Sequence, residues 1–262
     1  MEREIPSAKV TVAPFLIDVR ETTNAELAEA LTNMSSMLVV DDDEEEKDKH
    51  VPRFVRWAKF SGRSGVVADL QPRRGGVEYV ATGNRLRPPR SFEPITGRER
   101  EPAVQVTWEG AAAICAARGK RLPTEDEFEA AARGRTDRRF PWGNEPPRCN
   151  GVVLPRDGLI KMDPACPETV DRRPVGEASQ DVTPEGVFDL GGNVAEWTSS
   201  AFVEGDRAAR VDASRADLQK VIRGGSWAAS LLARTSGRTR RPPDFAADNL
   251  GFRCAMSREK GK

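Results

Sequence analysis

The stretch LGGNVAEW at residues 190–197 is followed along the chain by RGGSW at residues 223–227 and by LGFRC at residues 250–254. Each segment places glycine close to a tryptophan or phenylalanine. Glycine permits tight turns, and a large aromatic ring favours burial. The three segments therefore predict tight turns that are anchored in a core, in a chain with much irregular structure.

The overall charge of the chain is balanced. Its 262 residues include 41 Lys plus Arg and 41 Asp plus Glu, so no net field attracts it to nucleic acid or to a membrane surface. No apolar run approaches the roughly 20 residues that span a bilayer, and the first residues lack the apolar core of a secretory signal. Composition thus predicts a cytoplasmic protein without nucleic-acid or membrane partners.

The single histidine limits the available chemistry. His50 alone cannot supply the several ligands of a multi-histidine iron, copper or zinc site. It stands beside an acidic run, which is a poor place for the base of a Ser–His or Cys–His pair. The cysteines show no CxxC spacing, so a zinc site is not expected either; they are Cys115, Cys149, Cys166 and Cys254.

Two capping boxes and one isolated N-cap predict three helices, which begin after Thr23, Thr107 and Thr124. In a capping box the threonine hydroxyl accepts from the third backbone N–H, and a glutamate three residues on reaches back to the cap. Gly119 and Gly134 predict the ends of the second and third helices.

Strand signals are weaker than helix signals. Alternating apolar residues predict a half-buried strand over residues 9–21, interrupted at Pro14. Residues 62–103, rich in Arg, Gly and Pro, predict irregular connections with one short strand at residues 77–81. Six consecutive carboxylates at residues 41–46 predict a solvated loop rather than a cation site, since adjacent carboxylates point apart.

Six segments, in the same order along the chain, resemble the formylglycine-generating enzyme (FGE) family of sulfatase-modifying factors. Three are the segments quoted first. The other three are VQVTW at residues 104–108, GKRLPTE at residues 119–125 and FPWG at residues 140–143. One such segment alone would be weak evidence, but six in order are specific, and they cover nearly the whole chain.

The resemblance implies an α+β fold: a single FGE-sulfatase-type domain over residues 1–262, related to C-type lectins. Such a domain has few short helices, short antiparallel strands and much irregular structure. The family begins with a further strand, for which only residues 1–8 are available here. Either that strand is absent or the sequence is a domain excised from a longer protein, since some family members are C-terminal domains of kinases.

The family's chemistry, as the resemblance implies it, needs thiols that this chain lacks. Members oxidise a substrate cysteine with copper, oxygen and two cysteines of their own, placed shortly after the GGS segment. Residues 228–234 occupy that stretch here, and no cysteine occurs from residue 167 to residue 253. Copper(I) prefers soft thiolate ligands, and the superfamily's iron-dependent oxygenases use histidines. We therefore expect no redox-active cofactor, and the sequence argues against an enzyme.

The resemblance also implies structural calcium. Asn193 and Glu196 match a calcium-binding turn of the family, and Asn150 matches its other calcium site, with Asp163 as a candidate acidic partner. Amide, carbonyl and carboxylate oxygens suit Ca²⁺. The alternative is that these side chains hydrogen-bond the backbone of their turns.

The family's substrate groove would lie at four residues: Ser226, Trp227, Arg234 and Arg238. Arginines there offer paired donors to a ligand carboxylate, whereas Trp227 could equally belong to the core. The arginine-rich stretches at residues 133–139 and 238–241 lack interleaved aromatic residues. A solvated surface is expected for both stretches, rather than a nucleic-acid interface.

Cys115 and Cys254 match two family positions that lie next to each other. A disulfide between them would need an oxidising compartment, and two buried thiols in contact are the alternative. For a cytoplasmic protein we expect the thiols. Cys149 and Cys166 match no family position.

These observations predict a non-catalytic, FGE-like binding or regulatory module, because the fold holds variable loops on a rigid frame. Its partner would be a protein, a peptide or another domain of a larger chain. Two alternatives remain open. One is a formylglycine-generating oxidase that acts on a sulfatase-type cysteine through an unforeseen nucleophile. The other is a diversity-generating variable protein, with ligand-binding residues between Trp227 and Leu250.

Overall fold

The computed structural model describes residues 10–42, 52–57, 66–69, 77–80, 91–149, 151–155, 171–203 and 219–258. Its helices are α1 (Asn24–Asn33), α2 (Trp108–Ala117) and α3 (Glu125–Arg133), with short 3-10 helices η1 (Ser35–Met37) and η3 (Leu231–Ala233). Its strands are β1 (Phe15–Ile17), β2 (Leu38–Asp42), β3 (Pro52–Trp57), β4 (Val66–Asp69), β5 (Val77–Val80), β6 (Ser91–Pro94), β7 (Ala195–Ala201), β8 (Lys220–Arg223), β9 (Arg238–Arg241), β10 (Leu250–Gly251) and β11 (Ala255–Ser257).

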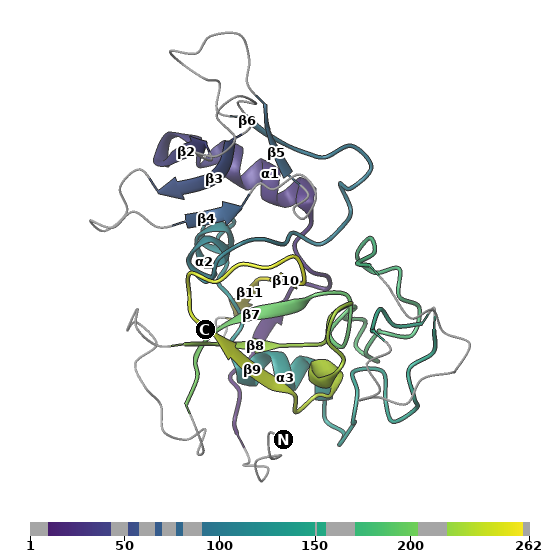
Figure 1. Ribbon diagram of the computed structural model, residues 1–262. Helices are drawn as coiled ribbons and strands as arrows, with labels where there is room; N and C mark the ends of the chain where they lie inside the picture. Colours follow the sequence, from purple (N-terminus) through teal and green to yellow (C-terminus); the bar gives the residue numbers. More distant parts are fainter. Residues whose placement is uncertain are drawn as a thin grey trace.

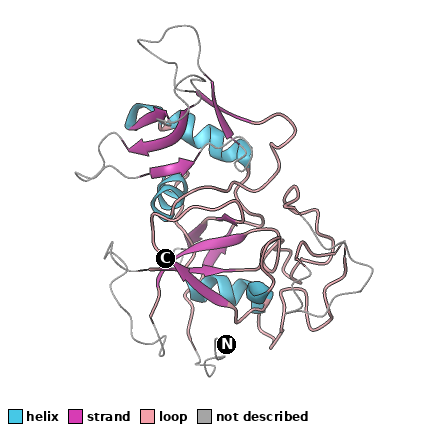
Figure 2. Cartoon of the chain, in the orientation of Figure 1, coloured by secondary structure: helices cyan, strands magenta, loops and turns pink. Residues whose placement is uncertain are grey.

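The strands form several small sheets. The largest has the order β10-β7-β8-β9, and only its β10–β7 pair is parallel among the described strand pairs. α3 packs against β7 and β8, while β1 and β11 form a separate antiparallel pair. The β2-β3-β4 sheet and the β5–β6 pair lie with α1 in the upper part of Figure 1. Long loops separate these elements, above all between α3 and β7 (Figure 2), so the fold is α+β with much irregular structure.

The helix starts lie where the sequence predicts them. Thr23 and Thr124 each form a complete capping box, and the Thr107 hydroxyl accepts from the backbone N–H of Gly110. α3 ends at Gly134, whose φ of 62° lies in the left-handed region that glycine adopts at little cost. Local capping chemistry therefore determines these boundaries.

The strand predictions need correction. The first strand is shorter than predicted and spans only β1, after Pro14. Residues 62–103 contain β4, β5 and β6 rather than one short strand, and Asp41 and Asp42 belong to β2 rather than to a loop. These strands are fixed by partners elsewhere in the chain, as in the pairing of β3 with both β2 and β4, and local composition does not report such partners.

Several sequence predictions lie outside the described residues: residues 1–9, 43–46, His50, Asn150, Asp163 and Cys166. None of the helices in the described part of the chain is long and apolar enough to cross a membrane.

The main hydrophobic core joins α1 and α2 to β7 and β10. Leu31 and Ile114 face it from the two helices, and Phe252 enters just after β10; all three are fully buried. Trp197 of the LGGNVAEW segment is fully buried at its centre, and its indole N–H donates to the carbonyl of Val106 at 3.0 Å. That bond satisfies the one polar group of the ring, so the tryptophan anchors its turn in the core.

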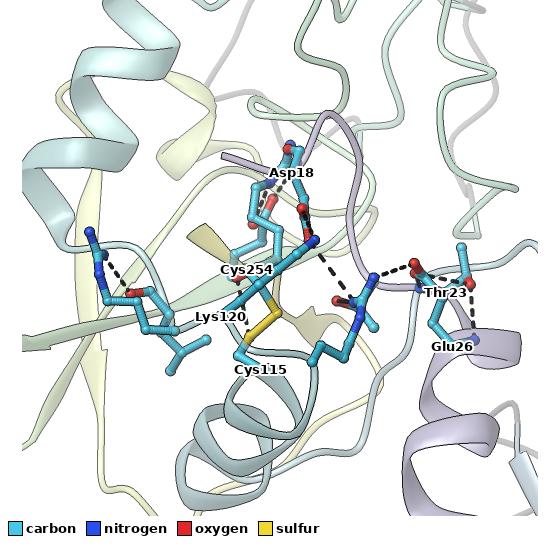
Figure 3. Close-up of a disulfide and its surroundings, with 12 residues drawn as sticks. Asp18, Thr23, Glu26, Cys115, Lys120 and Cys254 are labelled. Carbon is cyan, nitrogen blue, oxygen red and sulfur yellow. Dashed lines mark hydrogen bonds and ion pairs between the residues drawn. A yellow bond between two sulfur atoms is a disulfide. The ribbon is translucent and has the colours of Figure 1, made fainter. Parts of the chain in front are cut away.

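Cys115 of α2 and Cys254, just before β11, lie side by side in this core and are joined by a disulfide (Figure 3). Their Cα atoms are 5.6 Å apart, and both residues are fully buried. They are not the two thiols expected for a cytoplasmic protein. Cys149 is disulfide-bonded as well. The Cys115–Cys254 bond closes a loop across 139 residues and ties a helix to the C-terminal strand.

Removing this disulfide should destabilise the fold. For the double variant Cys115→Ala/Cys254→Ala we expect a loss of about 2–4 kcal/mol in the free energy of unfolding, because the unfolded chain regains its loop entropy and two packed sulfurs are lost. Urea denaturation measures the change. Alkylation of the denatured, non-reduced protein should leave both cysteines unmodified, and labelling of either one would contradict the bond.

Candidate binding site

The three glycine-bearing segments meet at one place in the structure. The backbone N–H of Trp227 donates to the carbonyl of Asn193 at 2.9 Å, and its indole N–H donates to the carbonyl of Asp248 at 3.2 Å. A Cβ atom on Gly225 would lie 2.3 Å from the carbonyl oxygen of Gly191. The turns thus approach so closely that only glycine fits at position 225.

Asn193 stabilises the first of these turns. It adopts a φ of 64°, a left-handed conformation that asparagine tolerates better than most residues. Its Oδ1 accepts from the backbone N–H of Arg173 at 2.9 Å, and its Nδ2 donates to Glu21 at 2.8 Å. Glu21 in turn accepts from the backbone N–H of Val194 at 3.1 Å. The N-terminal segment is therefore bound to the turn through a buried carboxylate.

Glu196 and Arg253 form a fully buried ion pair. The guanidinium Nε and Nη2 donate to the two carboxylate oxygens, each at 2.7 Å, and neither side chain is exposed. Arg253 also donates to the carbonyls of Asp18 at 3.2 Å and Phe188 at 2.9 Å. Most donors of the guanidinium are thereby satisfied, which a buried charge requires.

This arrangement of Asn193 and Glu196 does not fit a shared calcium ion. Asn193 directs its Nδ2 donor at Glu21, and both oxygens of Glu196 are bonded to Arg253. Among the described residues no group of three or more His, Cys, Asp or Glu side chains has a metal-binding arrangement. Calcium binding here stays a prediction, and hydrogen bonding within the turns is what the described contacts favour.

Three further carboxylates lie buried around this ion pair. Burial, reinforced by the charge of Asp189, raises the pKa of both Glu21 and Asp181 well above the usual range. Burial also raises the pKa of Asp189 to about 6, although a hydrogen bond from the backbone N–H of Gly176 opposes the shift. Each raised pKa shifts its carboxyl toward the neutral, protonated form, which lessens the repulsion among carboxylates that surround a single guanidinium.

The loop that follows RGGSW is built from turns. Ser226 is almost fully buried, and its Oγ accepts from the backbone N–H of Ala228 and the side-chain amide of Asn249, each at 3.3 Å. Its backbone exchanges two hydrogen bonds with Ala229. η3 follows, and there Ala233 packs in a small cluster with Phe140. The hydroxyl of Ser226 thus braces the loop rather than facing a ligand.

The other predicted groove residues lie on two elements, the loop that follows RGGSW and strand β9. Trp227 is half-buried rather than a core residue, and Arg234 lies half-buried on the same loop. Arg238 belongs to β9, where its Nε lies 3.1 Å from Glu125 at the start of α3. What this loop leaves exposed is apolar: Ala228 and Leu231, the latter 49% exposed.

Sequence reasoning missed a group of aromatic residues beside the arginines of β9. The guanidinium groups of Arg238 and Arg240 lie 4.5 and 4.4 Å from the centroid of the Phe202 ring. Arg241 lies 5.3 Å from the ring of Phe245. Phe202 follows β7 and is distant from β9 in the sequence, so the linear pattern of residues 238–241 gave no signal of it.

Together the converging turns and the buried ion pair define a fold of the FGE-sulfatase class. The family model of the Sulfatase-modifying factor enzyme 1-like domain matches residues 1–258, and the chain belongs to that family.

The chain is about equally similar to a relative named as an inactive enzyme and to one named as an enzyme. It is 33% identical to the inactive C-alpha-formylglycine-generating enzyme 2 of Mus musculus, over 99% of this chain and 80% of the relative. It is 32% identical to the formylglycine-generating enzyme of Streptomyces coelicolor, over 96% of this chain and 81% of the relative. Overall identity therefore does not decide between an active and an inactive protein.

A solved structure confirms the fold. PvdO from Pseudomonas aeruginosa superposes with a TM-score of 0.57 at 22% identity, over 93% of this chain and 80% of that one.

The buried ion pair should show strong coupling between its partners. Glu196→Gln leaves the guanidinium without its counter-charge, so we expect a loss of about 3–5 kcal/mol in the free energy of unfolding. The double variant Glu196→Gln/Arg253→Met should lose less stability than the sum of the losses of Glu196→Gln and Arg253→Met, because the second substitution removes the guanidinium that the first leaves without its paired carboxylate. Urea denaturation of all four members of the cycle tests this, and additive losses would contradict it.

Stability should also depend on the proton of Asp189. The folded state holds this proton up to about pH 6, whereas the unfolded carboxyl loses it near 3.8, so stability falls as the pH rises between these values. Asp189→Asn mimics the protonated form. We expect it to be more stable than the wild type by up to about 3 kcal/mol near neutral pH, and nearly equal to it at about pH 4.

The matched control is Asp244→Asn, at an exposed position. It should leave the pH dependence of thermal unfolding unchanged. An equal response of the two variants would contradict the role of Asp189.

Proposed function

We propose that this chain is a non-catalytic binding or regulatory module that recognises a protein or peptide partner. The observation that carries the proposal is the composition and geometry of the loop at residues 226–235. It contains no cysteine, and its serine hydroxyl is engaged in holding the turn.

The sulfur atoms elsewhere support the same conclusion. Cys115 and Cys254 are bonded to each other, Cys149 is disulfide-bonded, and no described cysteine is a free thiol. A copper(I) site of the kind that the family resemblance implies needs thiolate ligands. The described part of the chain offers none, either in the loop or beside it.

The packing around the loop at residues 226–235 supports a role in binding a partner. The loop is anchored to a small hydrophobic cluster through Ala233. In this cluster Phe140 stacks on Trp142 with ring centroids 4.8 Å apart. Ala228 and Leu231 of the same loop are exposed, and Trp227 is half-buried. Binding residues commonly lie on loops that a rigid scaffold positions, and the exposed leucine and alanine of this loop offer apolar contact area.

The disulfides also bear on where the protein works. Disulfides persist in oxidising compartments and are rare in the cytosol. The buried Cys115–Cys254 bond therefore supports an oxidising location over the cytoplasmic one that composition predicts. The partner would accordingly be a protein or peptide in that compartment, or another domain of the same polypeptide.

The rival function, formylglycine generation, is tested directly. We expect no aldehyde when the protein is incubated with copper, oxygen and a cysteine-containing sulfatase peptide, because the loop supplies no sulfur to bind the metal. The formylglycine-generating enzyme of Streptomyces coelicolor is the positive control. Mass spectrometry and hydrazide labelling detect the product, and catalytic turnover would overturn the proposal.

A further inference from the structure

β9 is the edge strand of the main sheet, next to β8. It pairs antiparallel with β8 through all four of its residues, and no other described strand pairs with it (Figure 1). The outward N–H and C=O groups of an edge strand form a ready template for another extended chain.

The arginines of this strand fall into two kinds. Arg238 is largely buried and ion-paired with Glu125. Arg240 is half-buried and Arg241 is exposed, and no described carboxylate forms a salt bridge with either. Arg223, across the sheet, is buried and paired with Glu129. Within the described part of the chain, Arg240 and Arg241 therefore keep charge that no carboxylate neutralises.

Aromatic rings hold these two guanidinium groups in place. Arg240 lies over Phe202 and Arg241 over Phe245. A guanidinium stacked on a ring keeps edge N–H groups available, and these match a carboxylate in paired fashion. Nη1 of Arg241 donates to the carbonyl of Arg240 at 2.8 Å, so Arg241 offers its remaining donors. The side chains are therefore ordered before any ligand arrives, which lowers the entropic cost of binding.

The strand geometry places the two charges on opposite faces of the sheet. Successive side chains of a strand point to opposite faces, and Arg238 and Arg240, two apart, do share the ring of Phe202. Arg241 lies opposite Lys220 of β8 in the register. Lys220 is buried with its ammonium 4.0 Å from the centroid of the Trp108 ring, whereas Arg241 is exposed, so Arg241 is the one of the two that a partner can reach.

We propose that the β9 edge binds an extended acidic peptide segment as an added strand. Main-chain hydrogen bonds to β9 would supply affinity. Two adjacent carboxylates of the peptide would point to opposite faces, one toward Arg240 and the other toward Arg241. This inference rests on the proposed binding function and names the surface and the chemistry of the partner.

A labelled peptide tests the proposal. The probe is a short threonine- and valine-rich peptide with two adjacent glutamates, and its binding to the full chain is followed by fluorescence anisotropy. We expect Arg240→Gln and Arg241→Gln each to weaken binding on the order of tenfold, since each removes a charge-assisted hydrogen bond. Arg135→Gln, at an exposed arginine outside β9, should leave the affinity unchanged.

Two matched peptides separate charge from strand addition. Replacing the glutamates with glutamines should weaken binding as the arginine variants do. Methylating alternate backbone nitrogens of the acidic peptide should abolish binding, because main-chain pairing is then blocked. Equal affinity for the glutamine peptide, for the methylated peptide or for the two arginine variants would overturn the proposal.

Binding of a nucleic acid, or of a second copy of this chain, at the β9 edge would give a different result in these assays. Tighter binding of a single-stranded oligonucleotide than of the acidic peptide, or concentration-dependent self-association abolished by Arg240→Gln/Arg241→Gln, would also overturn it. Failure of the peptide to bind, with no aldehyde formed in the copper assay, rejects this surface and leaves the non-catalytic function standing. Aldehyde formation rejects the non-catalytic function itself.

Discussion

The arrangement of the turns depends on the hydrogen bonds that the buried guanidinium of Arg253 donates. This guanidinium binds the carboxylate of Glu196 on β7 and the carbonyls of Asp18 and Phe188, which come from segments distant in the sequence. Few regular elements join these segments, so backbone ladders alone cannot set their positions. A planar group with five donors can hold several acceptors at fixed angles. Several carboxyl groups are buried around this guanidinium, and their raised pKa values show that burial there disfavours the charged form.

The parts of the structure that sequence predicts are those with local causes. Capping boxes at Thr23 and Thr124 act within one helical turn, so their residues are adjacent in the sequence. The close approach at Gly225 is likewise signalled by a glycine that no other residue can replace. The strands β4, β5 and β6 depend on distant partners, and the role of Glu21 depends on Asn193, more than a hundred residues away. The residues next to each position in the sequence do not predict such long-range contacts.

The same distinction applies to the candidate sites. The absence of cysteine after RGGSW is visible in the sequence, and with it the argument against copper chemistry. The engagement of Ser226 and Arg238 by protein partners is visible only in three dimensions. A residue at a family's groove position can therefore serve the fold alone. Scaffold and chemistry are separable here because the turns are held by glycine packing and by Arg253, neither of which involves the loop's missing thiols.

Charged residues on an edge strand have a second physical role, since they discourage pairing with stray strands. That role alone does not explain the arrangement at β9. Protection needs only charge, which a mobile lysine supplies, whereas Arg240 and Arg241 are each stacked on an aromatic ring and so are ordered. Ordering a side chain costs entropy that protection does not require. The two roles are compatible. The positive charges repel basic strands and would lose hydration without compensation against an apolar strand, but they attract an acidic one, and this selectivity is what a binding edge needs.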